Sequence, residues 1–235
     1  MCQQKLYALS NRCARDLFMR KNNYMLILDA AFELFYANGY NNTSMADIAG
    51  KLHLTKPALS YHFGTKEELG QEVCLRYNQK LSGSFIQAAK AKDPNADPLI
   101  IQTAYLLWKA GIFYCEDKKA FRFFCDFIHR FPEYSALQNP FQEMYALFAD
   151  TYFPEMSAAQ MDFHITKNLY ATIGLIYRYT LGKIECTQQE YLQLYFEMFF
   201  PSDMQDTGPE NNLFERAMRF LKTNTFQVLP YYEVH

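Results

Sequence analysis

The chain has 235 residues, and 50% of them are hydrophobic, so it can bury a substantial core and can hold one small and one medium domain. The formal net charge is −2, yet residues 1–80 carry 10 Lys and Arg against 7 Asp and Glu, while residues 81–235 carry 13 against 18. The composition excludes a strongly basic chain, and the uncharged stretches are too short for a membrane helix, which needs about 20 apolar residues.

Apolar residues recur at helical spacing almost throughout, and no run of alternating residues with hairpin signals is convincing, which predicts an all-α fold. Residues 1–20 show no helical face and are expected to form a mobile N-terminal extension. The first helix is predicted over 22–38, where Ile27 and Leu34 share an apolar stripe. Gly39 follows at the position of a left-handed cap.

Two short helices come next. Thr43 or Ser44 offers a side-chain oxygen to cap a helix that ends near Leu52. Thr55 caps the following helix, and Pro57 lies in its first turn, where the missing N–H has no intrahelical partner. Longer amphipathic segments follow, with a turn over 93–98, a polar linker over 201–212 and an aromatic tail. The second short helix is predicted over 55–63. The helices after it are predicted over 66–91, 98–115, 118–130, 132–153 with a break at Pro140, 157–182, 187–200 and 213–226.

Two short helices joined by a turn of about three residues, with a longer helix before them, form the geometry that places one helix in the major groove of DNA. Residues 39–49, 54–63 and 66–69 combine a glycine, helix caps, apolar positions, aromatic residues and a following lysine in this order. With these residues the stretch resembles the signature of the Tet repressor family over about residues 24–72. His53 replaces the common turn glycine, and Ser60 stands where the family usually has tyrosine. The residues that carry the resemblance are Gly39-Tyr40-Asn41-Asn42-Thr43-Ser44-Met45-Ala46-Asp47-Ile48-Ala49, Leu54-Thr55-Lys56-Pro57-Ala58-Leu59-Ser60-Tyr61-His62-Phe63 and Lys66-Glu67-Glu68-Leu69.

The resemblance implies a helix-turn-helix DNA-binding domain over 21–64 and a helical regulatory and dimerisation domain over 65–235. It also implies that the helix over 55–63 reads base edges from its exposed face, while Leu59 and Phe63 point into the small core. Helix N-termini favour phosphate, which adds backbone clamps. The residues expected at the DNA are Ser44, Thr55, Lys56, Pro57, Ala58, Ser60, Tyr61, His62 and Lys66.

Basic residues near the N-terminus suit either a solvated tail or an arm for the minor groove. They are Lys5, Arg12, Arg15, Arg20 and Lys21.

Aromatic residues are abundant, with 18 Tyr, 21 Phe and 1 Trp. Rings at helical spacing pack a core, but a helical bundle walled by rings also forms apolar cavities with a few polar tips. Because the resemblance implies regulation, we expect an apolar or aromatic small-molecule ligand, with core packing as the open alternative. The candidate residues are Tyr105, Trp108, Phe124 and Tyr177.

A palindromic DNA site needs two recognition helices about 34–36 Å apart, so a second subunit must hold them in register. The helix over 157–182 offers small residues beside bulky ones, which suits a homodimer interface, and the alternative is packing within one subunit. The second interface helix is either 187–200 or 213–226. The candidate interface residues are Ala171, Gly174, Leu175 and Gly182.

The six cysteines lack paired Cys-x-x-Cys spacing, and no signal peptide opens the chain, so we expect reduced thiols and a cytoplasmic protein. Cys125 and His129 share a helix face with Cys115 upstream, but this set lacks a fourth ligand, so we expect no metal. The sequence also offers no catalytic constellation or cofactor fingerprint.

The sequence therefore predicts a ligand-responsive transcriptional regulator that is not an enzyme and needs no cofactor. In this interpretation a homodimer represses transcription from a palindromic operator and is released by a small molecule. The alternative is a helical dimeric sensor or scaffold that does not bind DNA.

Overall fold

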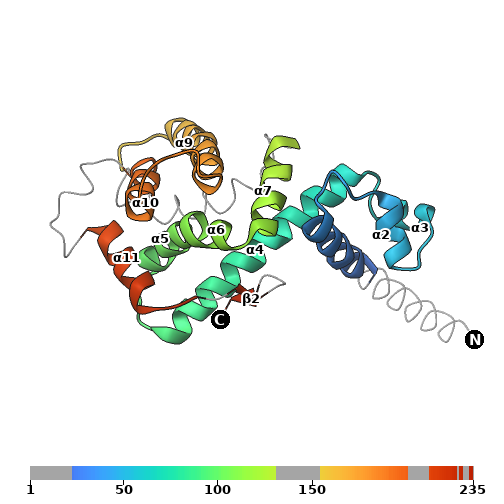
Figure 1. Ribbon diagram of the computed structural model, residues 1–235, viewed down its shortest axis with the longest axis horizontal. Coiled ribbons are helices and arrows are strands. Elements are labelled where there is room, and N and C mark those ends of the chain that lie inside the picture. Colours follow the sequence, from blue (N-terminus) through green and yellow to red (C-terminus); the bar gives the residue numbers. More distant parts are fainter. Residues whose placement is uncertain (1–22, 131–153, 201–211, 227, 230–232, 235) are drawn as a thin grey trace, which may run out of the picture. The chain divides into compact units, whose positions relative to one another are not determined.

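The computed structural model describes residues 23–130, 154–200, 212–226, 228–229 and 233–234. The predictions for 1–20, for 132–153 and for most of the 201–212 linker lie outside these residues. The described part is all α, as predicted, apart from a small hairpin near the C-terminus (Figure 1). After a first helix over 23–38, the elements are α2 Met45–Lys51, α3 Lys56–His62, α4 Lys66–Lys92, α5 Pro98–Trp108, the π-helix η1 Lys109–Phe113, α6 Tyr114–Glu116, α7 Lys118–Arg130, α9 Ala158–Thr180, α10 Gln188–Glu197, α11 Leu213–Thr223, β1 Val228–Leu229 and β2 Glu233–Val234.

The chain divides into two compact units, and the boundary falls within α4, between Cys74 and Leu75. The sequence places a domain boundary before that helix, between residues 64 and 65, and this functional division stays a prediction. Among the described residues, none of the helices is long and apolar enough to cross a membrane.

The first unit is built around the helix over 23–38. Ile27, Ala31 and Phe35 of this helix are fully buried. The helix ends where predicted, because Gly39 takes a φ of 91° and its N–H donates to the Phe35 carbonyl at 2.8 Å. Only glycine adopts this φ without strain, so the sharp turn into the next helix depends on Gly39.

The second unit has an aromatic core in which α11 packs along α5 (Figure 1). Phe85 of α4 lies at its centre. Its ring centroid lies 5.4 Å from that of Tyr105, 5.1 Å from that of Trp108 and 4.3 Å from that of Phe226. Aromatic rings at these distances contribute to stability beyond the area they bury, so this cluster ties α4 and α5 to the segment after α11.

The helix predicted over 98–115 contains a π-helical segment, η1, between α5 and α6. A π-helix bonds each carbonyl to the N–H five residues on, so the turn is wider and neighbouring carbonyls lose their usual partners. Side chains of α10 form hydrogen bonds to two of these carbonyls. Gln188 Nε2 donates to the Gly111 carbonyl at 2.8 Å, and the Tyr191 hydroxyl donates to the Ala110 carbonyl at 3.3 Å. A Cβ on Gly111 would lie 2.5 Å from Leu192 Cδ2, so only glycine lets α10 approach this closely.

The predicted helix over 213–226 ends earlier, at Thr223. Two polar side chains cap its last carbonyls: Thr223 Oγ1 donates to the Arg219 carbonyl at 3.0 Å, and Asn224 Nδ2 donates to the Phe220 carbonyl at 2.9 Å. The chain beyond forms the β1–β2 hairpin, which pairs Val228 with Val234 and which the sequence does not predict.

Candidate nucleic-acid interface

The turn between α2 and α3 is held by backbone hydrogen bonds. The Leu54 N–H donates to the Ala49 carbonyl at 2.9 Å, and the His53 N–H donates to the Gly50 carbonyl at 3.1 Å. His53 has a φ of 54°, the left-handed region that side chains rarely adopt. The position at which the family usually has glycine therefore has the backbone conformation that glycine favours.

Ser44, rather than Thr43, caps α2. Its Oγ accepts from the Asp47 N–H at 3.2 Å, while its own N–H and hydroxyl both donate to Asp47 Oδ2 at 2.7 Å. These bonds lower the pKa of the Asp47 carboxyl, the one from the Ser44 hydroxyl most. Thr43 is buried instead, and its hydroxyl donates to the carbonyls of Gly39 and Leu34 at 3.0 and 3.2 Å. Phosphate contact by Ser44 stays a prediction, and it requires the serine to share its donors with Asp47.

The recognition helix α3 is anchored on one face and open on the other. Thr55 caps it, as predicted, by accepting from the Ala58 N–H at 3.3 Å. Leu59 is completely buried, whereas Tyr61 is 68% exposed. Of the predicted DNA-contacting residues on this helix, His62 is half-buried, and Lys56, Pro57, Ala58, Ser60 and Tyr61 are exposed.

The start of α4 carries the predicted clamp Lys66. Thr65 Oγ1 accepts from the Glu68 N–H at 3.1 Å, and Glu68 Oε2 accepts from the Gly64 N–H at 2.9 Å, so the helix begins where predicted. Lys66 is half-buried, and its Nζ lies 4.1 Å from the centre of the Tyr40 ring. Sequence reasoning assigned no role to Tyr40, although this residue belongs to the quoted motif.

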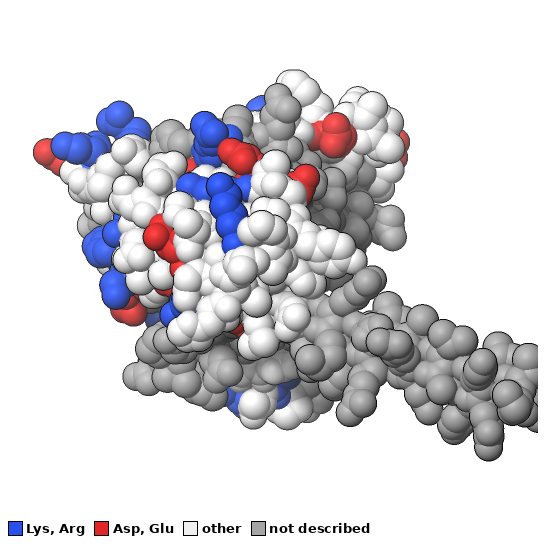
Figure 2. All heavy atoms as spheres, turned by 90° about the vertical axis from the view of Figure 1, so that its right-hand side faces the viewer, with Lys and Arg blue, Asp and Glu red and all other residues white. Residues whose placement is uncertain are grey.

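Few cations lie in the described part of the first unit. Residues 23–74 hold three Lys against six Asp and Glu, a net charge of −3, so the net +3 of residues 1–80 comes from outside this range. Figure 2 shows the side on which α2 and α3 lie in Figure 1, and its Lys and Arg side chains are mixed with Asp and Glu. One of the three lysines, Lys51, has its Nζ 2.7 Å from Glu33 Oε2. Phosphate attraction by residues 23–74 would therefore depend on a small number of well-placed side chains.

Of the three predicted ligand residues whose side chains the structure describes, two lie together. Tyr105 and Trp108 are buried neighbours on α5, with ring centroids 6.4 Å apart. Burial raises the pKa of the Tyr105 hydroxyl, which has no hydrogen-bond partner within the described structure. Tyr177 lies elsewhere, 39% exposed on α9 with its ring 6.1 Å from that of Phe121. The side chain of Phe124 lies outside the described part. The ligand role of these residues stays a prediction.

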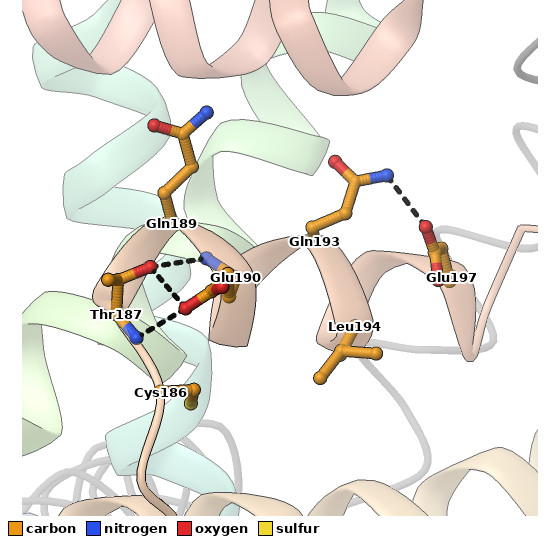
Figure 3. Close-up of a pocket in the computed structure, with 7 residues that line it drawn as sticks. All are labelled: Cys186, Thr187, Gln189, Glu190, Gln193, Leu194 and Glu197. Atoms are coloured by element: carbon orange, nitrogen blue, oxygen red, sulfur yellow. Dashed lines mark hydrogen bonds between the residues drawn. The ribbon is translucent and has the colours of Figure 1, made fainter.

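Two open grooves lie in the second unit, and neither is lined by these aromatic residues. One, of about 570 Å³, follows α10 (Figure 3). Its polar side chains form hydrogen bonds within the helix. The Thr187 hydroxyl caps α10, because it accepts from the Glu190 N–H and donates to Glu190 Oε2. Gln193 Nε2 donates to Glu197 Oε1 at 2.8 Å. The other, of about 470 Å³, lies between the turn before α5 and α11, where Arg216 bonds Asp97 at 3.1 Å. Both grooves are lined mainly by groups that already serve the fold.

The described residues contain no group of three side chains suited to hold a metal ion. Burial raises the pKa of the Cys125 thiol to about 12 and also raises that of Cys115. Both thiols are therefore protonated at neutral pH, which disfavours metal binding and nucleophilic chemistry.

Three of the predicted dimer residues lie on α9, and the fourth, Gly182, follows its C-terminal end. Ala171, Gly174 and Gly182 are exposed, and Leu175 is half-buried. Four large apolar side chains of this region are also exposed: Phe163 by 70%, Tyr170 by 43%, Tyr177 by 39% and Leu181 by 45%.

Comparison with known proteins gives one family and a set of similar folds. Residues 27–73 match the family described as bacterial regulatory proteins, tetR family. No curated protein matches the chain. The crystal structure of the multidrug binding protein EbrR complexed with imidazole has a TM-score of 0.51 and 16% identity, and the match covers 74% of this chain and 93% of that chain. A putative tetR family transcription regulator from Shewanella sp. PV-4 has a TM-score of 0.51 and 16% identity, with 76% and 96% covered. At this identity the likeness concerns the fold.

The matched residues contain the recognition helix, its capped support helices and the clamp of α4. Together with the helix-turn-helix geometry of this segment, the match assigns residues 27–73 to the DNA-binding region of the tetR family of bacterial regulatory proteins.

Proposed function

We propose that this chain is a ligand-responsive transcriptional regulator, which as a homodimer binds a palindromic operator, represses transcription and is released by a small molecule. The observation that carries the proposal is the exposed face of α3. Leu59 fixes one side of the helix in the core, while Lys56 and Tyr61 face solvent. In a major groove, Lys56 donates to guanine or phosphate, and Tyr61 reaches phosphate or a base edge. Ala58 and Pro57 suit contact with a thymine methyl group.

The test is a gel-shift measurement against the region upstream of the chain's own gene, over a series of salt concentrations. Lys66→Ala should weaken binding to all sequences and lower the salt slope by roughly 0.9 for each phosphate that the protein no longer neutralises. Tyr61→Ala should cost about 1–3 kcal/mol at the operator and less elsewhere if the side chain reads a base. Lys222→Ala removes the same charge from α11 and serves as the control. Unchanged affinity and salt slope for Lys66→Ala would exclude this docking, and intact dimers without specific binding would favour a sensor or scaffold.

The exposed face of α9 supports the homodimer. Large apolar side chains exposed along one helix face mark interaction sites, because soluble monomers rarely expose such patches. On α10, Leu194 is 50% exposed, whereas Phe214 and Phe220 of α11 are buried. We therefore propose α9 and α10 as the two interface helices, which with those of the partner form a four-helix bundle.

Gly174→Arg tests this interface, because a Cβ on Gly174 has nothing within 4 Å and the helix itself tolerates a side chain. A buried, unpaired guanidinium is costly in an interface. Light scattering should report a monomer of 27.6 kDa whose operator affinity has collapsed and whose helical circular dichroism persists. The matched control is Gly83→Arg on α4, where a Cβ is equally unobstructed. A Gly174→Arg protein that stays dimeric would place the interface on another face.

A thermal-shift screen of apolar and aromatic compounds tests the ligand. One protein of similar fold is described as a multidrug binding protein, which supports this choice of compounds. A ligand at 100 times its Kd adds about 2.7 kcal/mol of stability, and an inducer should also release DNA because it favours one separation of the recognition helices. A compound that stabilises the protein but leaves operator affinity unchanged is not an inducer.

A further inference from the structure

The Lys66 ammonium lies over the face of the Tyr40 ring, with 4.1 Å between Nζ and the ring centre. The aromatic face carries negative charge density and attracts a cation at this distance. The two residues come from different parts of the first unit. Tyr40 lies in the loop before α2, and Lys66 is the first residue of α4. The contact therefore fixes a flexible side chain against a separate part of the fold.

The Tyr40 ring is a rigid support. It is 2% exposed, and its centroid lies 5.0 Å from that of Phe35, which is fully buried. Its backbone is also fixed, because the Thr43 N–H donates to the Tyr40 carbonyl at 3.2 Å and the preceding Gly39 ends the first helix with a φ of 91°. The ring position is thus set by the core and by the turn, independently of Lys66.

Lys66 occupies a position that its charge does not favour. The first turn of a helix carries partial positive charge, so a lysine there is repelled, whereas Glu67 and Glu68 are stabilised. The Glu68 carboxylate already accepts from the Gly64 N–H at 2.9 Å. A lysine side chain also has much rotamer freedom to lose before it can hold a phosphate. The Tyr40 ring counters both effects, since it attracts the ammonium and confines it to the start of α4.

We propose that Tyr40 is a positioning residue, which holds the Lys66 ammonium ready for a DNA phosphate. This inference rests on the proposed function, because it assigns Tyr40 a role through the predicted clamp. The described part of this unit, residues 23–74, holds three lysines, so we expect the placement of Lys66 to influence DNA affinity.

The contact itself is tested in the free, full-length protein by NMR. The ε-methylene protons of Lys66 should be shifted upfield by the Tyr40 ring. The shift should persist in Tyr40→Phe, which keeps the ring, and should disappear in Tyr40→Leu. Because Tyr40→Leu removes a buried ring and could unfold the unit, position 40 is also replaced by pentafluorophenylalanine, which keeps the shape of phenylalanine but has an electron-poor face. Ordinary random-coil shifts for Lys66 in the unsubstituted chain would overturn the inference.

The role is tested by operator affinity against salt concentration in a double-mutant cycle. Tyr40→Phe should bind like the unsubstituted chain. Tyr40→Leu and the fluorinated variant should weaken operator binding about two- to five-fold and show the shallower salt slope of Lys66→Met. In the Lys66→Met background they should cause no further weakening, whereas in the matched Lys56→Met background the effect should remain.

Equal effects with and without Lys66 would show that the ring acts only through folding, and would overturn the positioning role. If the unsubstituted chain fails to bind DNA while the Lys66 shift is present, the proposed function fails and the phosphate role fails with it. If DNA binds but the cycle shows no coupling, the proposed function stands and only this inference is overturned.

Discussion

The two units of this chain differ in how far apart in the sequence their hydrogen-bonded side chains lie, because the longest-range side-chain hydrogen bonds of the described residues are in the second unit. In the helix-turn-helix unit, the bonds that start each helix join residues three or four apart, as in the caps made by Ser44, Thr55 and Glu68. In the second unit, Gln188 bonds a carbonyl 77 residues away, Tyr191 one 81 residues away, and Arg216 pairs with a carboxylate 119 residues away. The first kind of contact is visible in a short stretch of sequence. The second kind exists only once the chain has folded.

Gly111→Ala should have the largest effect, because it acts where the long-range contacts converge. The new Cβ would lie 2.5 Å from Leu192 Cδ2, and Leu192 is 1% exposed, so its side chain has to shift within a packed core. Overpacking of this kind costs about 1–3 kcal/mol. Trp108 is the only tryptophan of the chain and is buried in this unit, so urea unfolding followed by its fluorescence measures the destabilisation.

The control for this substitution is Gly83→Ala in α4, where a Cβ meets nothing within 4 Å. This change should stabilise by roughly 0.5–1 kcal/mol, since alanine loses less backbone entropy in a helix. A Gly111→Ala protein as stable as the control would show that η1 and α10 are not tightly packed.

Tyr191→Phe should have a smaller effect in the same place. The ring keeps its stacking on Tyr179, at 3.6 Å between centroids, but the Ala110 carbonyl loses its donor. The expected cost is about 0.5–1.5 kcal/mol by the same fluorescence measurement. Tyr61→Phe removes a hydroxyl from a residue that is 68% exposed and should change stability by less than about 0.5 kcal/mol. Equal effects of the two substitutions would remove the distinction between long-range and local contacts.

His53→Gly should stabilise the helix-turn-helix unit by up to about 1 kcal/mol, because glycine adopts a φ of 54° without strain. Hydrogen exchange of the α2 and α3 amides is the measurement, since it reports this unit alone. The stability of His53→Asn should lie between those of the unsubstituted chain and of His53→Gly, and His53→Val should destabilise the unit. Slower exchange with valine than with glycine would contradict the left-handed turn. Trp108 fluorescence should show that substitutions of His53 leave the unfolding of the second unit unchanged.

Acid should affect the two units in different pH ranges. Burial lowers the pKa of His164, whose Nε2 lies 3.3 Å from the Phe199 carbonyl; this carbonyl partly opposes the shift, and Lys167 adds to it. A folded-state pKa below the unfolded value means that stability is complete above about pH 6.5 and is lost as the pH falls below it. The lowered pKa of Asp47 also makes the stability fall as the pH falls, but only below about pH 4.

The melting temperature followed by Trp108 fluorescence should therefore fall between pH 7 and pH 5, and His164→Gln should flatten the curve. Exchange of the α2 amides should not respond to Asp47 in this range. A second unit with the same melting temperature at both pH values would contradict the lowered pKa of the half-buried His164.

The difference between local and long-range contacts also explains which features could be predicted from the sequence. The ends of α3 and the start of α4 were predictable because Thr55, Thr65 and Gly64 act within one turn of the helices that they cap or interrupt. The choice between Thr43 and Ser44 was not predictable, because it depends on Thr43 reaching the Leu34 carbonyl in the previous helix.

In the second unit, helical periodicity predicted α7 and α9 but not η1, whose stability depends on α10. Phe226 was predicted in a helix. It lies beyond the end of α11 because its ring stacks on Phe85 of α4, a neighbour that no local pattern reveals. The environments of two predicted ligand residues were unpredictable for the same reason: Tyr105 and Tyr177 are both tyrosines in helices, but Tyr105 is buried and Tyr177 is 39% exposed.

The π-helix has a consequence for how this chain is aligned with others. One π turn accommodates one residue more than an α-helix of the same length, so η1 acts as a single-residue insertion within Lys109–Phe113. A relative with an uninterrupted helix here needs a one-residue gap. Without the gap, every position after it is rotated by about 100° around the axis, and Tyr114 is equated with a residue on a different face. A gap placed in η1 keeps both Trp108 and Tyr114 aligned with residues that point the same way.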